Sequence, residues 1–175
     1  MNRLAHLLPS VFSLAVVLGW SSARAAEPLT IVVDPGRLGS IAQAAVAEAT
    51  VNWWDDELAD DTACTESYAA IELQRFLALA LHVPVSEIAL ATPAQMPAKG
   101  RVLLVGSAGE SWLARVLPAT AVPTFAPEAA ESFHLRDFDD GGRTITVIMG
   151  RDRVGALYGV YAYLEKLGVK FYGLG

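Results

Sequence analysis

The sequence is poor in cysteine and basic residues and has no long apolar segment beyond its first residues. Cys64 is the only cysteine among 175 residues, so no internal disulfide can form and the fold depends on its hydrophobic core. Acidic side chains number 19 and basic ones 13. Because nucleic-acid binding relies on clustered Lys and Arg, we expect no nucleic acid among the partners.

Residues 1–25 have the pattern of a secretory signal peptide. Arg3 precedes an apolar run over residues 7–20, and residues 23–25 form an A-x-A cleavage site. A membrane anchor is the alternative, but this run is shorter than the about 20 residues that span a bilayer. We therefore expect export to the periplasm or the cell exterior, no membrane association after cleavage, and one mature domain over residues 26–175.

The hydrophobic pattern predicts strands that alternate with helices. Strands are expected over residues 29–34, 85–90 and 101–106, as a hairpin over 131–137 and 143–149 around a D-G-G turn, and after Gly168. Helices are expected over residues 40–50, 68–82 and 152–167 and around Trp112. These elements predict an α/β or α+β fold with a single mixed β-sheet and about three packed helices. The strand order is not predicted.

The last predicted helix carries small residues on one flank. Gly155, Gly159 and Ala162 fall together on a helical wheel. Interior glycines weaken a helix, so their presence indicates a packing or binding reason. We expect this flank to let the helix approach the sheet closely.

Residues 53–61, WWDDELADD, place adjacent tryptophans beside five carboxylates. Trp53 and Trp54 are candidates for stacking on a sugar, and the acids are candidates for a calcium site. The acidic spacing does not match an EF-hand loop, so we predict no metal site. The alternative is that one tryptophan packs into the core while the acids cap helices and remain solvated.

Three other features resemble functional motifs but have simpler explanations. Asp34 leaves a strand into a Pro-Gly turn; a carboxylate there can be catalytic, yet turn chemistry explains it. Residues 106–109, GSAG, precede a helix and could hold an anion, but the full G-x-G-x-x-G pattern is absent, so no nucleotide cofactor is expected. His134 has no accompanying nucleophile motif and is expected to be structural or on the surface.

Two runs carry a family resemblance. Residues 150–172, GRDRVGALYGVYAYLEKLGVKFY, and residues 69–77, AAIELQRFL, resemble the non-catalytic N-terminal domain of family 67 α-glucuronidases. The chain is also similar to the domains that precede the barrel in family 20 hexosaminidase-like proteins. In both families this domain comes before a (β/α)8 catalytic barrel. The resemblance therefore implies that the chain is the front of a longer enzyme.

The resemblance further implies that the catalytic acid, base or nucleophile belongs to a barrel in the same polypeptide. No catalytic residue and no cofactor are then expected in this chain. Tyr158, Tyr161 and Phe171 are the expected barrel-packing surface. The implied function is that of an accessory domain in an exported, α-glucuronidase-like glycoside hydrolase that takes part in xylan degradation.

Two alternatives of other classes remain open. One is a free-standing carbohydrate-binding module that binds oligosaccharide through Trp53, Trp54 or the tyrosines. The other is a scaffold that pairs with another exported protein through an exposed apolar patch.

Overall fold

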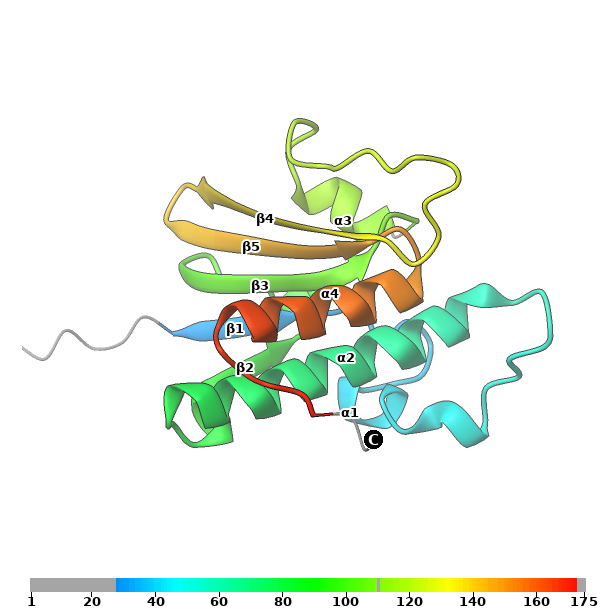
Figure 1. The fold of residues 1–175 in the computed structure, drawn as a ribbon, viewed down its shortest axis with the longest axis horizontal. Helices are drawn as coiled ribbons and strands as arrows, with labels where there is room; N and C mark the ends of the chain where they lie inside the picture. The colour runs from blue at the N-terminus through cyan, green and yellow to red at the C-terminus, as the bar shows by residue number, and fades with distance from the viewer. Residues whose placement is uncertain (1–27, 110, 173–175) are drawn as a thin grey trace, which may run out of the picture.

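The computed structural model describes residues 28–109 and 111–172, so the predicted signal peptide lies outside the described residues. Five strands form one mixed sheet in the order β2-β1-β3-β5-β4, as Figure 1 shows. Neighbouring strands run parallel except β4, which is antiparallel to β5. The strands are β1 (Leu29–Val32), β2 (Ile88–Ala91), β3 (Gly100–Ser107), β4 (Phe133–Asp140) and β5 (Arg143–Gly150). The predicted single mixed sheet is confirmed.

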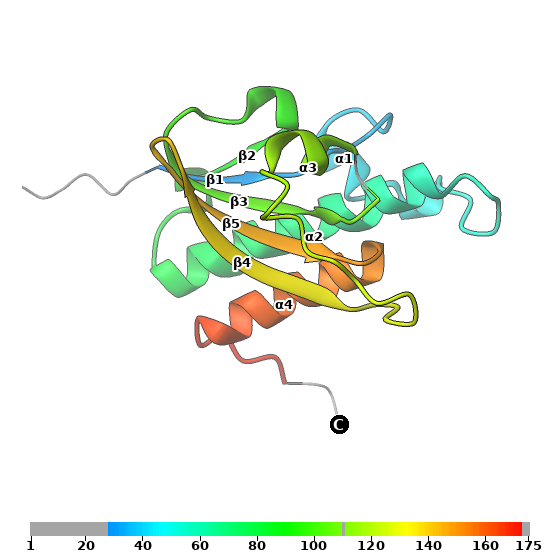
Figure 2. The ribbon, with the colours of Figure 1, turned by 90° about the horizontal axis from the view of Figure 1, so that it is seen from above.

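Helices cover both faces of this sheet unequally. The two long helices α2 and α4 lie side by side on one face, whereas the short α3 lies on the other (Figure 2). A further short helix, α1, contacts α2. The helices are α1 (Ile41–Ala44), α2 (Leu58–Leu81), α3 (Ser111–Val116) and α4 (Arg153–Lys166), with 3₁₀ turns η1 (Ala47–Ala49), η2 (Val85–Glu87) and η3 (Pro93–Gln95). In the described ranges, no helix is both long and apolar enough to cross a bilayer.

The side chains of the central strands alternate between two hydrophobic clusters. On β3, Leu103 and Val105 pack with α2 and α4, while Val102 and Leu104 pack with α3. All four are at most 3% exposed. Parallel strands buried on both faces read as continuous apolar runs, and this accounts for the sequence of β3.

The hairpin of β4 and β5 forms as the sequence predicts. Gly141 and Gly142 make its two-residue turn, with φ of 55° and 121°. Both angles lie in the left-handed region, which glycine adopts at little cost. The strands extend closer to the turn than expected, because Asp139 and Asp140 pair with Thr144 and Arg143.

The small flank of α4 does allow close packing. A Cβ atom on Gly155 would lie 2.2 Å from the carbonyl oxygen of Ser132. A Cβ atom on Gly159 would lie 2.9 Å from the Cγ2 atom of Ile148, on β5. The prediction of a close approach is confirmed, and its reason is packing against β5 and the segment that leads into β4.

Helix α2 begins ten residues earlier than the sequence predicts. Thr65 and Glu66, which precede the predicted start, lie inside it. Asp60 and Asp61 occupy its first turn, where negative charge stabilises a helix N-terminus. The Thr65 hydroxyl donates to the carbonyl oxygen of Asp61 at 2.9 Å, so this polar side chain is satisfied within the helix. The polarity of this stretch hid the helix from the sequence pattern, but Thr62 and Thr65 bond to helix carbonyls and Asp61 pairs with Arg153.

Two predicted strands are also corrected. Over residues 85–90, the first half forms the turn η2 and only β2 pairs with the sheet. Residues 169–172 form no strand. Phe171 instead packs its ring against Phe76 and Tyr161. Packing of an aromatic ring against α2 and α4 thus replaces pairing with a sheet edge.

Candidate functional site

An aromatic surface lies where α2, α4 and the segment after α4 meet. The ring centroid of Phe171 is 5.1 Å from that of Phe76 and 4.9 Å from that of Tyr161, both in edge-to-face geometry. A depression of about 300 Å³ lies among these three rings and Glu72 and Glu165. The aromatic surface consists of five residues, Phe76, Tyr158, Tyr161, Phe171 and Tyr172.

The aromatic surface is only partly covered by the domain itself. Tyr158 is 47% exposed, Tyr172 is 88% exposed and Phe171 is 36% exposed. Tyr158 and Tyr161 are three residues apart on α4, so they are neighbours on the helix surface. The structure thus places the three residues predicted to face a barrel, Tyr158, Tyr161 and Phe171, in one region. They leave apolar area free for a partner.

The hydroxyl group at the centre of this surface stays protonated at ordinary pH. Tyr161 donates a hydrogen bond to the Oε2 atom of Glu72 at 3.4 Å. Burial, followed by the nearby charge of Glu72, raises the pKa of Tyr161 to about 12. Tyr161 therefore acts as a hydrogen-bond donor with an apolar ring.

The two adjacent tryptophans take different positions. The Nε1 atom of Trp53 donates to the carbonyl oxygen of Glu48 at 2.9 Å, and the Arg153 guanidinium lies 5.6 Å from its ring centroid. Trp54 is 95% exposed. The pair therefore does not present a shared, empty platform, because one face of Trp53 is occupied by Arg153. Trp54 remains available for contact with a ligand.

The acidic residues that follow the tryptophans divide between the surface and one buried ion pair. Asp61 is 2% exposed, and its Oδ2 atom lies 3.1 Å from the Nη2 atom of Arg153. Asp55 accepts hydrogen bonds from Asn52 and from the backbone of Glu57. Among the described residues, no group of three or more His, Cys, Asp or Glu side chains is arranged to hold a metal ion.

Gly106, near the end of β3 and at the start of the GSAG step, is tightly packed. A Cβ atom on Gly106 would lie 2.8 Å from the Cδ1 atom of Leu113 and 3.3 Å from the Cζ2 atom of Trp112. Close packing against α3 explains why glycine stands there. This supports the interpretation of the step as a structural turn.

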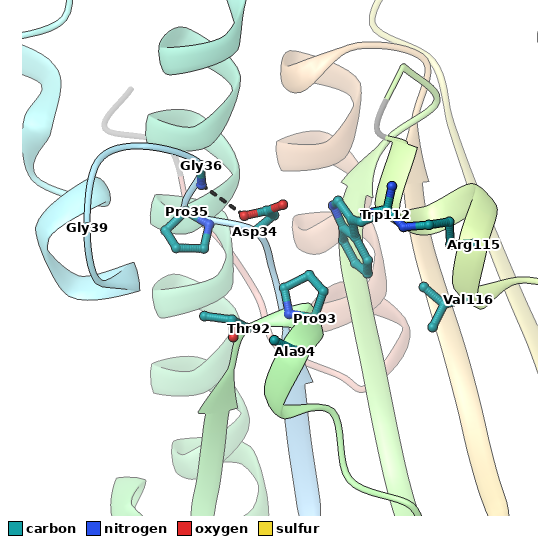
Figure 3. Close-up of a pocket in the computed structure, with 10 residues that line it drawn as sticks. All are labelled: Asp34, Pro35, Gly36, Gly39, Thr92, Pro93, Ala94, Trp112, Arg115 and Val116. Carbon is teal, nitrogen blue, oxygen red and sulfur yellow. Dashed lines mark hydrogen bonds between the residues drawn. The ribbon is translucent and has the colours of Figure 1, made fainter.

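A pocket of about 560 Å³ opens at the carboxyl ends of β1 and β2, beside α3 (Figure 3). The Oδ1 atom of Asp34 accepts the backbone N–H of Gly36 at 3.0 Å, as the turn chemistry predicts. Trp112 and Arg115 line the opposite wall. Sequence reasoning did not identify these last two residues, because neither belongs to a recognisable motif.

This pocket does not have the composition of a glycosidase active site. Asp34 is the only carboxylate among its lining residues, all of which the structure describes. Glycoside hydrolysis uses two carboxyl groups about 5–10 Å apart on either side of the scissile bond. The pocket therefore does not supply the pair of carboxyl groups that hydrolysis needs.

Comparison with known proteins identifies the family. The sequence matches the family described as glycosyl hydrolase family 67 N-terminus over residues 39–163. The match runs from just before α1 into the last turn of α4, and it includes the run 69–77 that carries part of the resemblance. A search of curated proteins found no match. The matched part is well over half of the chain, so the chain belongs to the glycosyl hydrolase family 67 N-terminus family.

Proposed function

We propose that this chain is the non-catalytic accessory domain of an exported, α-glucuronidase-like glycoside hydrolase that acts on glucuronoxylan. The family match over residues 39–163 carries the proposal. A (β/α)8 barrel in the same polypeptide supplies the catalytic carboxylates. The composition of the pocket beside Asp34 supports this division, since its lining holds a single carboxylate.

The aromatic surface is the proposed contact with the barrel. Exposed apolar patches on soluble domains commonly mark interaction sites, and this one combines Tyr158 and Tyr172 with the partly exposed ring of Phe171. Tyrosine suits such a contact because its ring buries apolar area while its hydroxyl finds a polar partner. In this arrangement the domain stabilises the barrel and shapes one side of its substrate cleft.

The size of the native polypeptide tests the proposal. An antibody raised against residues 26–175 is used for an immunoblot of producing cells, separated into cytoplasmic, periplasmic and secreted fractions. A (β/α)8 barrel adds about 250 residues or more, so we expect a band far above 18.6 kDa outside the cytoplasm. The full-length product should release glucuronic acid from glucuronoxylan. A band at the size of the domain alone would contradict the accessory role.

A free-standing carbohydrate-binding module is the second candidate, favoured by the 95% exposure of Trp54. In that case the domain binds soluble xylo-oligosaccharide through the Trp54 ring. Trp54→Ala should then abolish binding, measured by calorimetry, while Tyr172→Ala serves as a control that removes another exposed ring. Binding that survives the removal of both Trp53 and Trp54 would eliminate this candidate.

A further inference from the structure

The pocket beside Asp34 lies at the position where open sheets of parallel strands bind ligands. The strands β1 and β3 are neighbours in the sheet. After β1 the chain crosses to β2, at one edge of the sheet, whereas after β3 it crosses to the β4–β5 hairpin, at the opposite edge. The connections that follow β1 and β3 therefore diverge. A crevice forms between strands whose connections diverge in this way, and ligands of such sheets bind there. Its volume of about 560 Å³ lies in the range of small-molecule sites.

The pocket holds hydrogen-bonding groups that the fold does not use. Among the described residues, Asp34 forms a hydrogen bond through its Oδ1 atom alone, within the turn, and its other oxygen points toward Trp112 in Figure 3. Trp112 is 2% exposed, and its Nε1 atom has no hydrogen-bond partner among the described residues. In Figure 3 the edge of the indole that carries this nitrogen faces Asp34. A buried N–H without a partner on a pocket wall is a group whose hydrogen bonding a ligand or a water completes.

The lining also limits the kind of ligand. Asp34 and Arg115 contribute one charge of each sign, and Thr92 contributes a hydroxyl. The two charges offset one another, so the lining as a whole does not favour phosphates or other anions, and no second acid is present in the lining to hold a cation. Pro93 and Val116 provide apolar walls. These groups suit a neutral molecule with many hydroxyls and an apolar ring face.

We propose that this pocket binds a mono- or disaccharide. The second oxygen of Asp34 accepts hydrogen bonds from sugar hydroxyls, and the Arg115 guanidinium donates hydrogen bonds to sugar oxygens. The indole N–H of Trp112 donates to a ring oxygen or a hydroxyl of the sugar. The choice of xylose-based sugars as probes rests on the proposed function. The pocket itself is independent of whether a barrel follows.

Two-dimensional ¹H–¹⁵N NMR of the 175-residue chain tests the site. The indole N–H signal of Trp112 is assigned with a Trp112→Phe variant, and the protein is titrated with D-xylose, xylobiose, D-glucose, maltose and inorganic phosphate. We expect at least one sugar to shift the signals of Trp112, Gly36 and Thr92 saturably. Asp34→Asn should weaken that binding about tenfold or more, because it removes a charged acceptor.

Two further variants keep the test decisive. Arg115→Gln should weaken the same binding from the opposite wall, so the conclusion does not depend on how well Asp34→Asn folds. Glu87→Gln neutralises an exposed carboxylate in η2, outside the pocket, and should leave binding unchanged.

Three outcomes would overturn the proposal: no saturable shift with any sugar, shifts at Trp54 in place of Trp112, or a response to phosphate alone. Sugar binding at the pocket by a chain whose native form proves to be the isolated domain would support the site while refuting the accessory role. Hydrolysis by a longer product whose pocket binds no sugar would support the accessory role while refuting the sugar site.

Discussion

The guanidinium of Arg153, the first residue of α4, lies 3.1 Å from the Oδ2 atom of Asp61, in the first turn of α2. The Asp61 side chain is 2% exposed and that of Arg153 is 28% exposed. This ion pair ties the start of one long helix to the start of the other. The same guanidinium lies over Trp53, so it also holds the tryptophan segment against the fold.

Removal of Arg153 should therefore destabilise the domain strongly. Arg153→Met leaves a buried carboxylate unpaired, and we expect a loss of about 3 kcal/mol in the free energy of unfolding, measured by urea denaturation. The double variant Asp61→Asn/Arg153→Met should recover part of this loss, because the uncompensated charge is gone. Arg75→Met is the control: its guanidinium is 67% exposed, and its ion pair with Glu72 at 3.5 Å should contribute less than about 1 kcal/mol. Equal losses for Arg153→Met and Arg75→Met would refute the prediction.

The close approach of α4 predicts a penalty for a single methyl group. Gly155→Ala places a Cβ atom 2.2 Å from the Ser132 carbonyl oxygen. Although alanine favours a helix by about 1 kcal/mol over glycine, overpacking should dominate and give a net loss of about 1–3 kcal/mol. Gly109→Ala meets no atom within 4 Å and should change stability little. Thermal unfolding followed by circular dichroism compares the two variants, and an unchanged midpoint for Gly155→Ala would count against the packing described.

Asp152 predicts a loss of stability in acid. Its Oδ1 atom accepts the backbone N–H of Gly155 and its Oδ2 atom that of Glu131, both at 2.8 Å. Burial acts to raise the pKa of this carboxyl, but the backbone N–H donors outweigh it and the pKa is lowered. A carboxyl with a lowered pKa in the folded state stabilises the fold above its unfolded pKa of about 3.9 and loses that effect as pH falls through its folded pKa.

The measurement is the free energy of unfolding between pH 2 and pH 7. Asp152→Ala should lose about 1–2 kcal/mol at pH 7, as expected for a helix cap. The difference between this variant and the wild type should shrink toward low pH, where the wild-type carboxyl is protonated. Asp139→Ala, at an exposed position on β4, is the control. A difference that stayed constant across this pH range would contradict a role for the charge.

The aromatic surface predicts an effect that depends on the barrel. Tyr158→Ala should change the stability of the isolated chain by no more than about 0.5 kcal/mol, as for other surface positions. In the full-length product it should accelerate proteolytic separation of the domain from the barrel, because the contact between them loses apolar area. Trp54→Ala removes another exposed ring, outside this surface, and should leave the rate of this proteolytic cleavage unchanged. Equal cleavage rates for the two variants would place the interface elsewhere.

Much of the fold follows from local sequence. The D-G-G turn predicted the hairpin, since the two glycines adopt left-handed backbone angles at low cost. The apolar run of β3 predicted a buried strand, and the glycines of α4 predicted a closely packed helix. In each case residues a few positions apart carry the information.

The errors arose where distant residues supply the stabilisation. Asp61 looked like a solvated acid because its partner, Arg153, is 92 positions away in the chain. Residues 169–172 had the composition of a strand, but Phe171 packs against Tyr161 and against Phe76, which is distant in the sequence. Local composition contains neither fact.

The sequence by itself determined the periodicity of the strands and helices, the glycine positions and the family, because these depend on residue identity and short spacing. The tertiary structure alone decided where α2 begins, which acids are buried and which rings remain exposed. It also brought Asp34, Trp112 and Arg115 to one pocket. These features depend on which segments become neighbours when the sheet assembles in the order β2-β1-β3-β5-β4, and burial changes the chemistry of a side chain only once those neighbours are in place.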